Sequence, residues 1–252
     1  MSLNLEKTEL KKIIDDSIHG SSYLLKETVN LLGKKPLSVQ LDYLKKIVAS
    51  HRGMAYLVNL LKFVEETGRG CIEFYNEIKE AQREEMEKFV HQFQGLSVSV
   101  ISTFSYSGLV RDALIALYEK KPFALYIGES RPANEGIKFA EHLYNSGVKS
   151  ITVMSDACFF SKIERCDAVI LGCDGFTDTF FVNKTGSRAI VQLADYHKKD
   201  VYVIADRYKR LKGDVDLKRG DGGEIYRGKL PLMVLNPYLE RIDLLKNVII
   251  FY

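Results

Sequence analysis

From about residue 96 to the C-terminus, short apolar runs rich in β-branched residues alternate with stretches of helical periodicity. This alternation limits the possible folds more than any other feature of the sequence, because it is typical of βαβ units and a parallel sheet. The segment at 109–119 is one of the helical stretches. We therefore predict a mostly parallel sheet flanked by helices, with strands at 98–101, 123–127, 151–154, 168–171, 201–204 and 248–251.

The first 90 residues have a different character. Apolar residues recur there at helical spacing, as in Leu10, Ile13 and Ile14. Residues that favour turns and helix caps interrupt this pattern at 19–22, 33–36 and 68–70. The fold class that we expect is α/β, with an N-terminal bundle of four or five antiparallel helices at 1–90 and the α/β domain at 91–252.

Composition points to an ordinary globular protein of the cytoplasm. The 252 residues include 36 Lys and Arg against 33 Asp and Glu, and the net charge of +3 does not indicate direct binding to a nucleic acid. No apolar run approaches the roughly 18 residues expected of a membrane helix, so no membrane association is expected.

The side chains that often hold metals or cofactors do not form a recognisable pattern. The four cysteines lack CxxC spacing and are interpreted as free thiols, and the five histidines lack metal-ligand spacing. The sequence contains no GxGxxG after a strand, P-loop, HExxH or GxSxG motif. We expect neither a metal nor another cofactor.

Small polar clusters follow three of the predicted strands. Residues 129–132 follow the strand at 123–127, Asp156 comes shortly after 151–154, and Asp174 follows 168–171. In an open parallel sheet, ligands bind at the carboxyl ends of the strands. The sequence therefore predicts a pocket at this edge of the sheet.

Lys184 and Asn183 suggest that the ligand of this pocket carries a phosphate. Both residues precede a predicted helix at 186–196, and a helix N-terminus attracts anions. A lysine adds a point charge that suits phosphate. The alternative is that Asn183 caps the helix and Lys184 is solvated.

Other candidates also have two interpretations. Asp174 either orients sugar hydroxyls and moves a proton or forms a turn before Gly175. Arg131 and Glu135 either position a polar ligand or form a surface ion pair.

The order of these clusters resembles one superfamily, which unites the regulatory α, β and δ subunits of translation initiation factor 2B with methylthioribose-1-phosphate isomerase and ribose-1,5-bisphosphate isomerase. The residues that carry the resemblance are Glu129, Ser130, Arg131, Pro132, Glu135, Gly136, Asp156, Ala157, Gly172, Cys173, Asp174, Gly175, Asn183, Lys184, Thr185, Gly186, Tyr208, Lys209, Asn236 and Pro237. In the N-terminal half, the segment 49–59 with Arg52 resembles the family's arginine-containing pocket segment.

The resemblance implies a helical bundle joined to a Rossmann-like C-terminal domain, with a ligand between them. It also implies a homodimer or larger oligomer formed through the C-terminal domain, and contact with other initiation-factor subunits.

The resemblance further implies that the isomerase chemistry depends on a thiol. The isomerases carry a Thr, His, Cys, Asn segment after the first strand, and its thiol works with the aspartate that matches Asp174. Here residues 103–108 read Thr, Phe, Ser, Tyr, Ser, Gly, so Ser105 stands in place of the cysteine. A serine hydroxyl is far less acidic than a thiol and needs an adjacent base.

We therefore expect a regulatory or ligand-binding protein similar to the initiation factor 2B α subunit. Its sugar-phosphate or nucleotide pocket would use Arg52, Arg131, Glu135, Asn183 and Lys184, with Asp174 on the ligand hydroxyls and Ser105 at the pocket floor.

Two other interpretations stay open. In the first, the protein is an active isomerase of a phosphorylated ribose derivative, with Asp174 and either Ser105 or Cys173 as the catalytic pair. In the second, it is a structural subunit with a vestigial pocket. The Gly-rich segment at 209–230 is expected to be a surface loop or flap without an assigned role.

Overall fold

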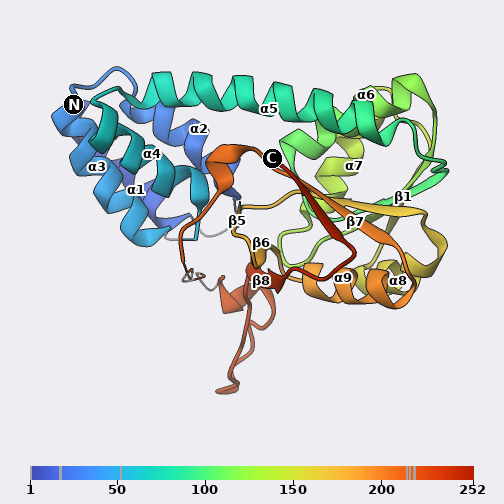
Figure 1. Cartoon of the computed structure of the whole chain (residues 1–252). Helices are drawn as coiled ribbons and strands as arrows, with labels where there is room; N and C mark the ends of the chain where they lie inside the picture. The colour runs from blue at the N-terminus through green and yellow to red at the C-terminus, as the bar shows by residue number, and fades with distance from the viewer. Residues whose placement is uncertain (1, 17–18, 52, 214, 216, 218–219) are drawn as a thin grey trace.

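The computed structural model describes residues 2–16, 19–51, 53–213, 215, 217 and 220–252. In Figure 1, the first N-terminal helices lie on one side and a layered α/β region lies on the other, and the long helix at 71–93 extends from the first region over the second. The N-terminal helices are α1 (Ser2–Asp15), α2 (Ser21–Leu32), α3 (Leu37–Ser50), α4 (Ala55–Thr67) and α5 (Cys71–Phe93). None of the helices in the described residues has both the length and the apolar composition needed to cross a membrane.

The main sheet has six parallel strands in the order β3-β2-β1-β4-β7-β9. This is the strand order of a doubly wound dinucleotide-binding fold, which confirms the predicted fold class. The strands are β1 (Val100–Thr103), β2 (Ala124–Gly128), β3 (Ile151–Met154), β4 (Ala168–Leu171), β7 (Asp200–Ile204) and β9 (Val248–Phe251).

Helices cover both faces of this sheet because successive side chains of a strand point to opposite faces. Ile170 of β4 packs with α6 (Gly108–Lys120) and α7 (Glu135–Asn145), whereas Leu171 packs with α8 (Asp156–Ser161) and α9 (Ser187–Tyr196). The two hydrophobic clusters therefore lie on either side of one sheet (Figure 1).

A second, antiparallel sheet was not predicted. It consists of β5 (Gly175–Phe176), β6 (Phe180–Lys184) and β8 (Leu239–Asp243). The predicted helix at 186–196 corresponds to α9, which begins at Ser187 with Gly186 as its N-cap, but Lys184 does not lie at the start of that helix, because it ends β6. The fully buried strand β6 begins with three apolar residues and ends with Asn183 and Lys184, and its partner, β8, has a mixed-charge sequence without a strand pattern.

Helix α5 joins the two regions. Phe74 and Ile78 in its first half pack in the helical core, whereas Phe89 and Phe93 near its end pack against the sheet. The domain boundary proposed at residues 90–91 falls within this helix.

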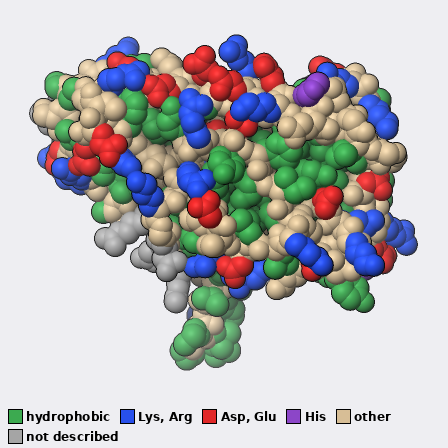
Figure 2. Space-filling model, viewed as in Figure 1, with side chains coloured by type: hydrophobic (Ala, Val, Ile, Leu, Met, Phe, Trp, Pro, Cys, Tyr) green, Lys and Arg blue, Asp and Glu red, His purple; other side chains and the backbone are tan. Residues whose placement is uncertain are grey.

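The segment at 225–235 projects from the rest of the molecule (Figure 1). Hydrophobic side chains gather on the projecting segment (Figure 2), and the exposed large hydrophobic residues between 225 and 235 are Ile225, Leu230, Leu232, Met233 and Leu235. The segment overlaps the predicted surface loop at 209–230, whose described residues include a β-bridge from Arg210 to Phe176 and a 3-10 turn at Gly222–Glu224.

A buried polar cluster ties the helical region to the sheet. The Tyr56 hydroxyl on α4 donates a hydrogen bond to Asp206, which follows β7, and accepts one of 2.7 Å from the Gln82 amide on α5. The Lys209 ammonium lies 5.0 Å from the centroid of the Tyr56 ring and donates to the Cys173 carbonyl at 2.5 Å. Burial raises the pKa of Asp206 because water no longer solvates the charged form.

The raised pKa of Asp206 predicts a pH-dependent stability difference between the wild type and Asp206→Asn. At pH values between the ordinary pKa of 3.8 and the raised pKa, Asp206 is more often protonated in the folded protein than in the unfolded chain. The contribution of Asp206 to the free energy of unfolding therefore falls as the pH rises through this window. The unfolding free energy of the wild type minus that of the variant should therefore decrease through this window and level off above it.

Urea unfolding from about pH 4 to about pH 8 measures this difference. Asp42→Asn, which changes an exposed carboxylate on α3, is the control and should show a smaller pH dependence. A wild-type-minus-Asp206→Asn difference that is independent of pH would contradict the assigned shift.

Candidate functional site

A cavity of about 540 Å³ lies at the carboxyl ends of β1 and β4, under the helical region. These two strands are neighbours, yet the chain leaves β1 toward β2 on one side and reaches β4 on the other, so the strand order reverses here. In doubly wound sheets this reversal opens the crevice where ligands bind. The cavity is lined from α2, from residues next to α3 and α4, from the loops after β1 and β4, and from α7, β6 and β8.

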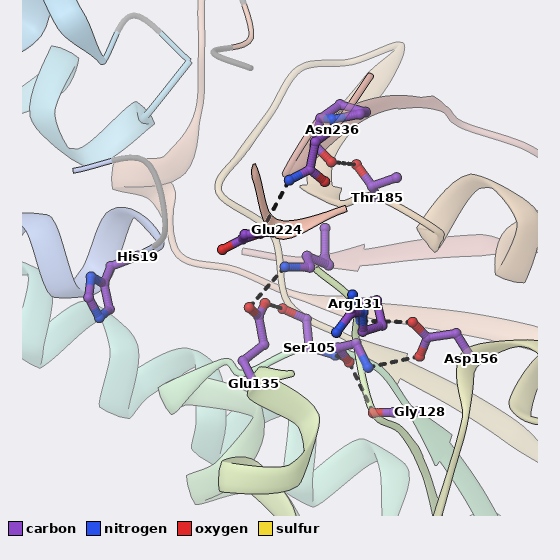
Figure 3. A network of polar contacts seen from close by, with 12 residues as sticks. His19, Ser105, Gly128, Arg131, Glu135, Asp156, Thr185, Glu224 and Asn236 are labelled. Atoms are coloured by element: carbon purple, nitrogen blue, oxygen red, sulfur yellow. Dashed lines mark hydrogen bonds and ion pairs between the residues drawn. The ribbon is translucent and has the colours of Figure 1, made fainter. Parts of the chain in front are cut away.

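Three side chains of the cavity lining, those of Ser105, Glu135 and Lys184, form a connected group, and Figure 3 shows the side chains of Ser105 and Glu135 pointing toward each other. Glu135, the first residue of α7, accepts a hydrogen bond of 2.5 Å from the Ser105 hydroxyl on one carboxylate oxygen. Its other oxygen accepts one of 2.9 Å from the Lys184 ammonium. The Lys184 side chain is only 3% exposed, and its ammonium lies 5.0 Å from the centroid of the Tyr238 ring. Glu135 therefore pairs with Lys184, which the sequence analysis did not foresee.

Asp156 holds the loop that positions Ser105. Its two carboxylate oxygens accept the backbone amides of Ser130 and Arg131 at 2.8 and 2.7 Å (Figure 3). The Ser105 amide in turn donates to the Ser130 hydroxyl at 2.8 Å. Ser105 and Ser130 have φ values of 70° and 63°, in the left-handed region that costs free energy for residues with a side chain. The hydrogen bonds to this loop hold both residues in that conformation.

Arg131 itself does not line the cavity. Arg131 contacts Asp156 only through its backbone amide, and Arg131 is exposed to solvent. Arg52 lies outside the described residues, although its neighbours His51 and Gly53 line the cavity.

Asp174 connects the sheet to the helical region. Its carboxylate accepts the backbone amide of Ser21 at 2.8 Å, at the first residue of α2, where the helix dipole favours a negative charge. Gly20 precedes Ser21, and a Cβ on Gly20 would lie only 3.1 Å from the Asp174 oxygen. Asp174 and Asn183 line the same cavity, and the Asn183 amide donates to the Ser187 hydroxyl at 3.0 Å.

Several lining residues had no predicted role. Tyr238 follows the Asn236–Pro237 pair that carries part of the family resemblance, and His19 lies in the predicted break at 19–22. Lys26 and Lys138 line the cavity from α2 and α7. For Lys138, the only sequence feature that could have indicated a place in the cavity lining is its position one turn after Glu135. The sequence does not indicate which face of α2 or α7 lines the cavity.

The cavity offers no reactive thiol. Cys173 lines it, but burial raises the pKa of this thiol to about 12, so the neutral form dominates at ordinary pH. Within the described residues, no group of three or more His, Cys, Asp or Glu side chains is arranged to hold a metal ion.

A family model described as the initiation factor 2 subunit family matches residues 5–220. The chain belongs to this family. The resemblance drawn from the strand-end clusters is therefore confirmed at the level of the family.

Individual relatives carry two kinds of name. A translation initiation factor eIF-2B subunit 2-like protein of Pyrococcus horikoshii is 31% identical over 189 residues, which span 70% of this chain and 67% of the relative. A ribose 1,5-bisphosphate isomerase of Methanocaldococcus jannaschii is 30% identical over 92 residues, which span 36% of this chain and 30% of the relative. The relatives alone therefore do not separate the regulatory from the catalytic role.

Solved structures support the fold. The crystal structure of the Pyrococcus horikoshii translation initiation factor eIF-2B has a TM-score of 0.80 at 26% identity, and the match covers 94% of this chain and 90% of that one. A chain of the tetrameric eIF2B β2δ2 complex of C. thermophilum has a TM-score of 0.64 at 16% identity, covering 84% and 80%, and shares the fold alone.

Cysteine alkylation tests the placement of the thiols. Cys158 is exposed, whereas Cys71, Cys166 and Cys173 are buried with raised pKa values. Iodoacetamide should modify Cys158 in the folded protein and react with the other three more than about tenfold more slowly. Peptide mass spectrometry measures the rates, and denatured protein, in which all four should react, is the control. Rapid modification of Cys173 in the folded protein would show that its thiolate is available.

Proposed function

We propose that this chain is a regulatory or ligand-binding protein similar to the initiation factor 2B α subunit, with a pocket for a sugar phosphate or nucleotide. The observation that carries the proposal is that Asp174, Asn183 and Lys184 line one cavity at the strand-order reversal. Ser105 stands there in the position where the related isomerases have a thiol.

In this proposal, the ligand contacts come from both halves of the chain. Asn183 and Lys184 bind the anionic ligand from β6, together with Arg52, whereas Arg131, which lies outside the cavity lining, contributes its backbone to the loop held by Asp156. Asp174 contacts the ligand hydroxyls through the oxygen that does not accept the Ser21 amide. Because Asp174 also contacts α2, a ligand bound there would change the contact between the helical region and the sheet.

We further propose that the protein acts in the cytoplasm as a homodimer or larger oligomer formed through its C-terminal domain, and that it contacts other initiation-factor subunits. A related chain comes from a complex named as a β2δ2 tetramer. The exposed apolar side chains of the 225–235 segment are available for such contacts. Ligand binding would then influence these contacts through α2.

The alternative is an aldose–ketose isomerase acting on ribose-1,5-bisphosphate or methylthioribose-1-phosphate. The presence of Asp174 in the cavity and the isomerase name of one relative favour it. Ser105 or Cys173 would have to replace the thiolate, and the raised pKa of Cys173 counts against that residue. The hydrogen bond that Ser105 donates to Glu135 gives the serine a neighbouring base, which is what this alternative requires.

A binding experiment tests the proposal. Ribose-1,5-bisphosphate, ribose 5-phosphate and AMP are titrated into the protein by calorimetry and by thermal shift. At least one of them should bind and raise the melting temperature. Lys184→Met should weaken that binding about tenfold or more, because it removes a charged hydrogen-bond donor and leaves Glu135 uncompensated. Lys149→Met, which lies outside the cavity lining, is the matched control and should bind normally.

The same samples separate the alternatives. Absence of binding by every phosphate ester would leave a structural subunit as the remaining interpretation. Conversion of either isomerase substrate to a ketose, followed by NMR and abolished in Asp174→Asn, would establish the enzyme and overturn the regulatory role.

A further inference from the structure

Tyr238 covers Lys184 on one side of the cavity. The Lys184 ammonium lies 5.0 Å from the centroid of the Tyr238 ring, and Tyr238 lines the cavity although only 5% of the residue is exposed. The Tyr238 carbonyl accepts the Thr185 amide at 3.0 Å, and the Pro237 carbonyl accepts the Thr185 hydroxyl at 2.7 Å. The backbone of Tyr238 is therefore fixed next to the end of β6, and the exposure of its ring depends on what covers it.

The strap, which comprises residues 220–224, covers the ring of Tyr238. A Cβ on Gly220 would lie only 1.9 Å from the Cε2 atom of that ring, so a residue with a side chain would push the strap and the ring apart. The strap ends in the short 3-10 turn Gly222–Glu224, and the projecting segment at 225–235 follows directly (Figure 1). The strap therefore lies between the cavity wall and a segment that extends away from the molecule.

Asn236, where the chain returns from the projecting segment, holds the strap in this position. Its carbonyl accepts a hydrogen bond of 2.7 Å from the Gly220 amide. Its side-chain amide donates to the Asp221 carbonyl at 2.6 Å and to the Glu224 carboxylate at 3.2 Å (Figure 3). Because Asn236 is only 4% exposed, water competes weakly for these hydrogen bonds. One side chain thus fastens the strap at two places.

The closed strap leaves one polar group without a partner. The Tyr238 hydroxyl is buried, and none of the residues that the structure describes forms a hydrogen bond of normal geometry with it. Burial and the nearby Glu224 carboxylate raise the pKa of Tyr238, so the hydroxyl keeps its proton. A buried donor without an acceptor costs free energy, which is recovered when water reaches the donor. The closed position is therefore held by Asn236 and opposed by the Tyr238 hydroxyl.

We infer that the strap opens and closes over Tyr238 and that this movement controls access to Lys184. When the strap opens, the Tyr238 hydroxyl reaches water, and the ring is free to move away from the Lys184 ammonium. When the strap closes, Asn236 regains its hydrogen bonds and the ring covers the ammonium again. The inference goes beyond the proposed function and does not depend on the identity of the ligand, because the reactivity of Lys184 itself reports access.

Hydrogen–deuterium exchange of the peptide that contains residues 220–224, measured in the full chain, tests the movement. Asn236→Asp keeps the shape of the side chain but removes both of its donated hydrogen bonds, so the strap amides should exchange about tenfold faster than in the wild type. Tyr238→Phe keeps the ring and removes the unpaired hydroxyl, so the same amides should exchange about fivefold more slowly.

Two matched variants are the controls. Asn247 is another buried asparagine, and its side-chain amide donates to the Lys199 carbonyl at 3.0 Å. Tyr196 is 79% exposed. Asn247→Asp and Tyr196→Phe should leave the exchange of the strap unchanged, which separates opening of the strap from a general loss of stability.

Acetylation by acetic anhydride, followed by peptide mass spectrometry, measures access to Lys184. The Lys184 amine should react faster in Asn236→Asp and more slowly in Tyr238→Phe than in the wild type. Lys149, which is exposed, should react at the same rate in all three proteins.

Three results would overturn this inference. The first is strap exchange that is unchanged in Asn236→Asp. The second is faster strap exchange in Tyr238→Phe, because the hydroxyl would then hold the strap closed. The third is equal acetylation of Lys184 in all three proteins, because the strap would then not control access. None of these results concerns the binding of a phosphate ester, so the proposed function stands or falls separately.

Discussion

The contact between the Asp174 carboxylate and the Ser21 amide links residues 153 positions apart and places α2 at the edge of the sheet. The helical region covers the crevice at the carboxyl ends of β1 and β4 and leaves the cavity of about 540 Å³. The buried cluster of Tyr56, Asp206 and Gln82 provides a second link between α4, α5 and the residues after β7. The position of the site therefore depends on both regions of the chain.

Charge balance within the cavity determines what it can bind. The Asp174 carboxylate accepts a hydrogen bond from the backbone amide at the first residue of α2, and the Glu135 carboxylate accepts one from the buried Lys184 ammonium. Both carboxylates are therefore already paired with protein donors. A site organised in this way offers directed hydrogen bonds rather than a large net charge. Directed hydrogen bonds suit the recognition of a hydroxylated ligand. The neutral thiol of Cys173 and the hydroxyl of Ser105 likewise add no charge to the cavity lining.

The sequence predicted the parallel sheet well because each of its strands is a short apolar run, and the bounds of β3, β4 and β9 coincide with the predicted segments. The antiparallel sheet was missed because β8 carries alternating charges and becomes a strand only through pairing with β6.

The candidate site was predicted less completely than the fold. Strand-end position correctly predicted that Asp174 lies at the cavity, whereas Asn183 and Lys184 were expected directly before a helix and reach the cavity from β6. It gave no information on which side chains pair with each other, because the Glu135–Lys184 contact joins residues 49 positions apart. Nor did it indicate that Arg131 would contribute its backbone amide to Asp156.

The central claim is that one anionic, hydroxylated ligand binds where the two regions of the chain meet. A crystal structure of the protein soaked with ribose 5-phosphate tests it most directly. The account predicts density for the sugar within hydrogen-bond distance of Glu135 and Asp174, with α2 still in contact with the Asp174 carboxylate. Density for the ligand only outside this cavity, or a cavity that stays empty at saturating ligand, would contradict the account.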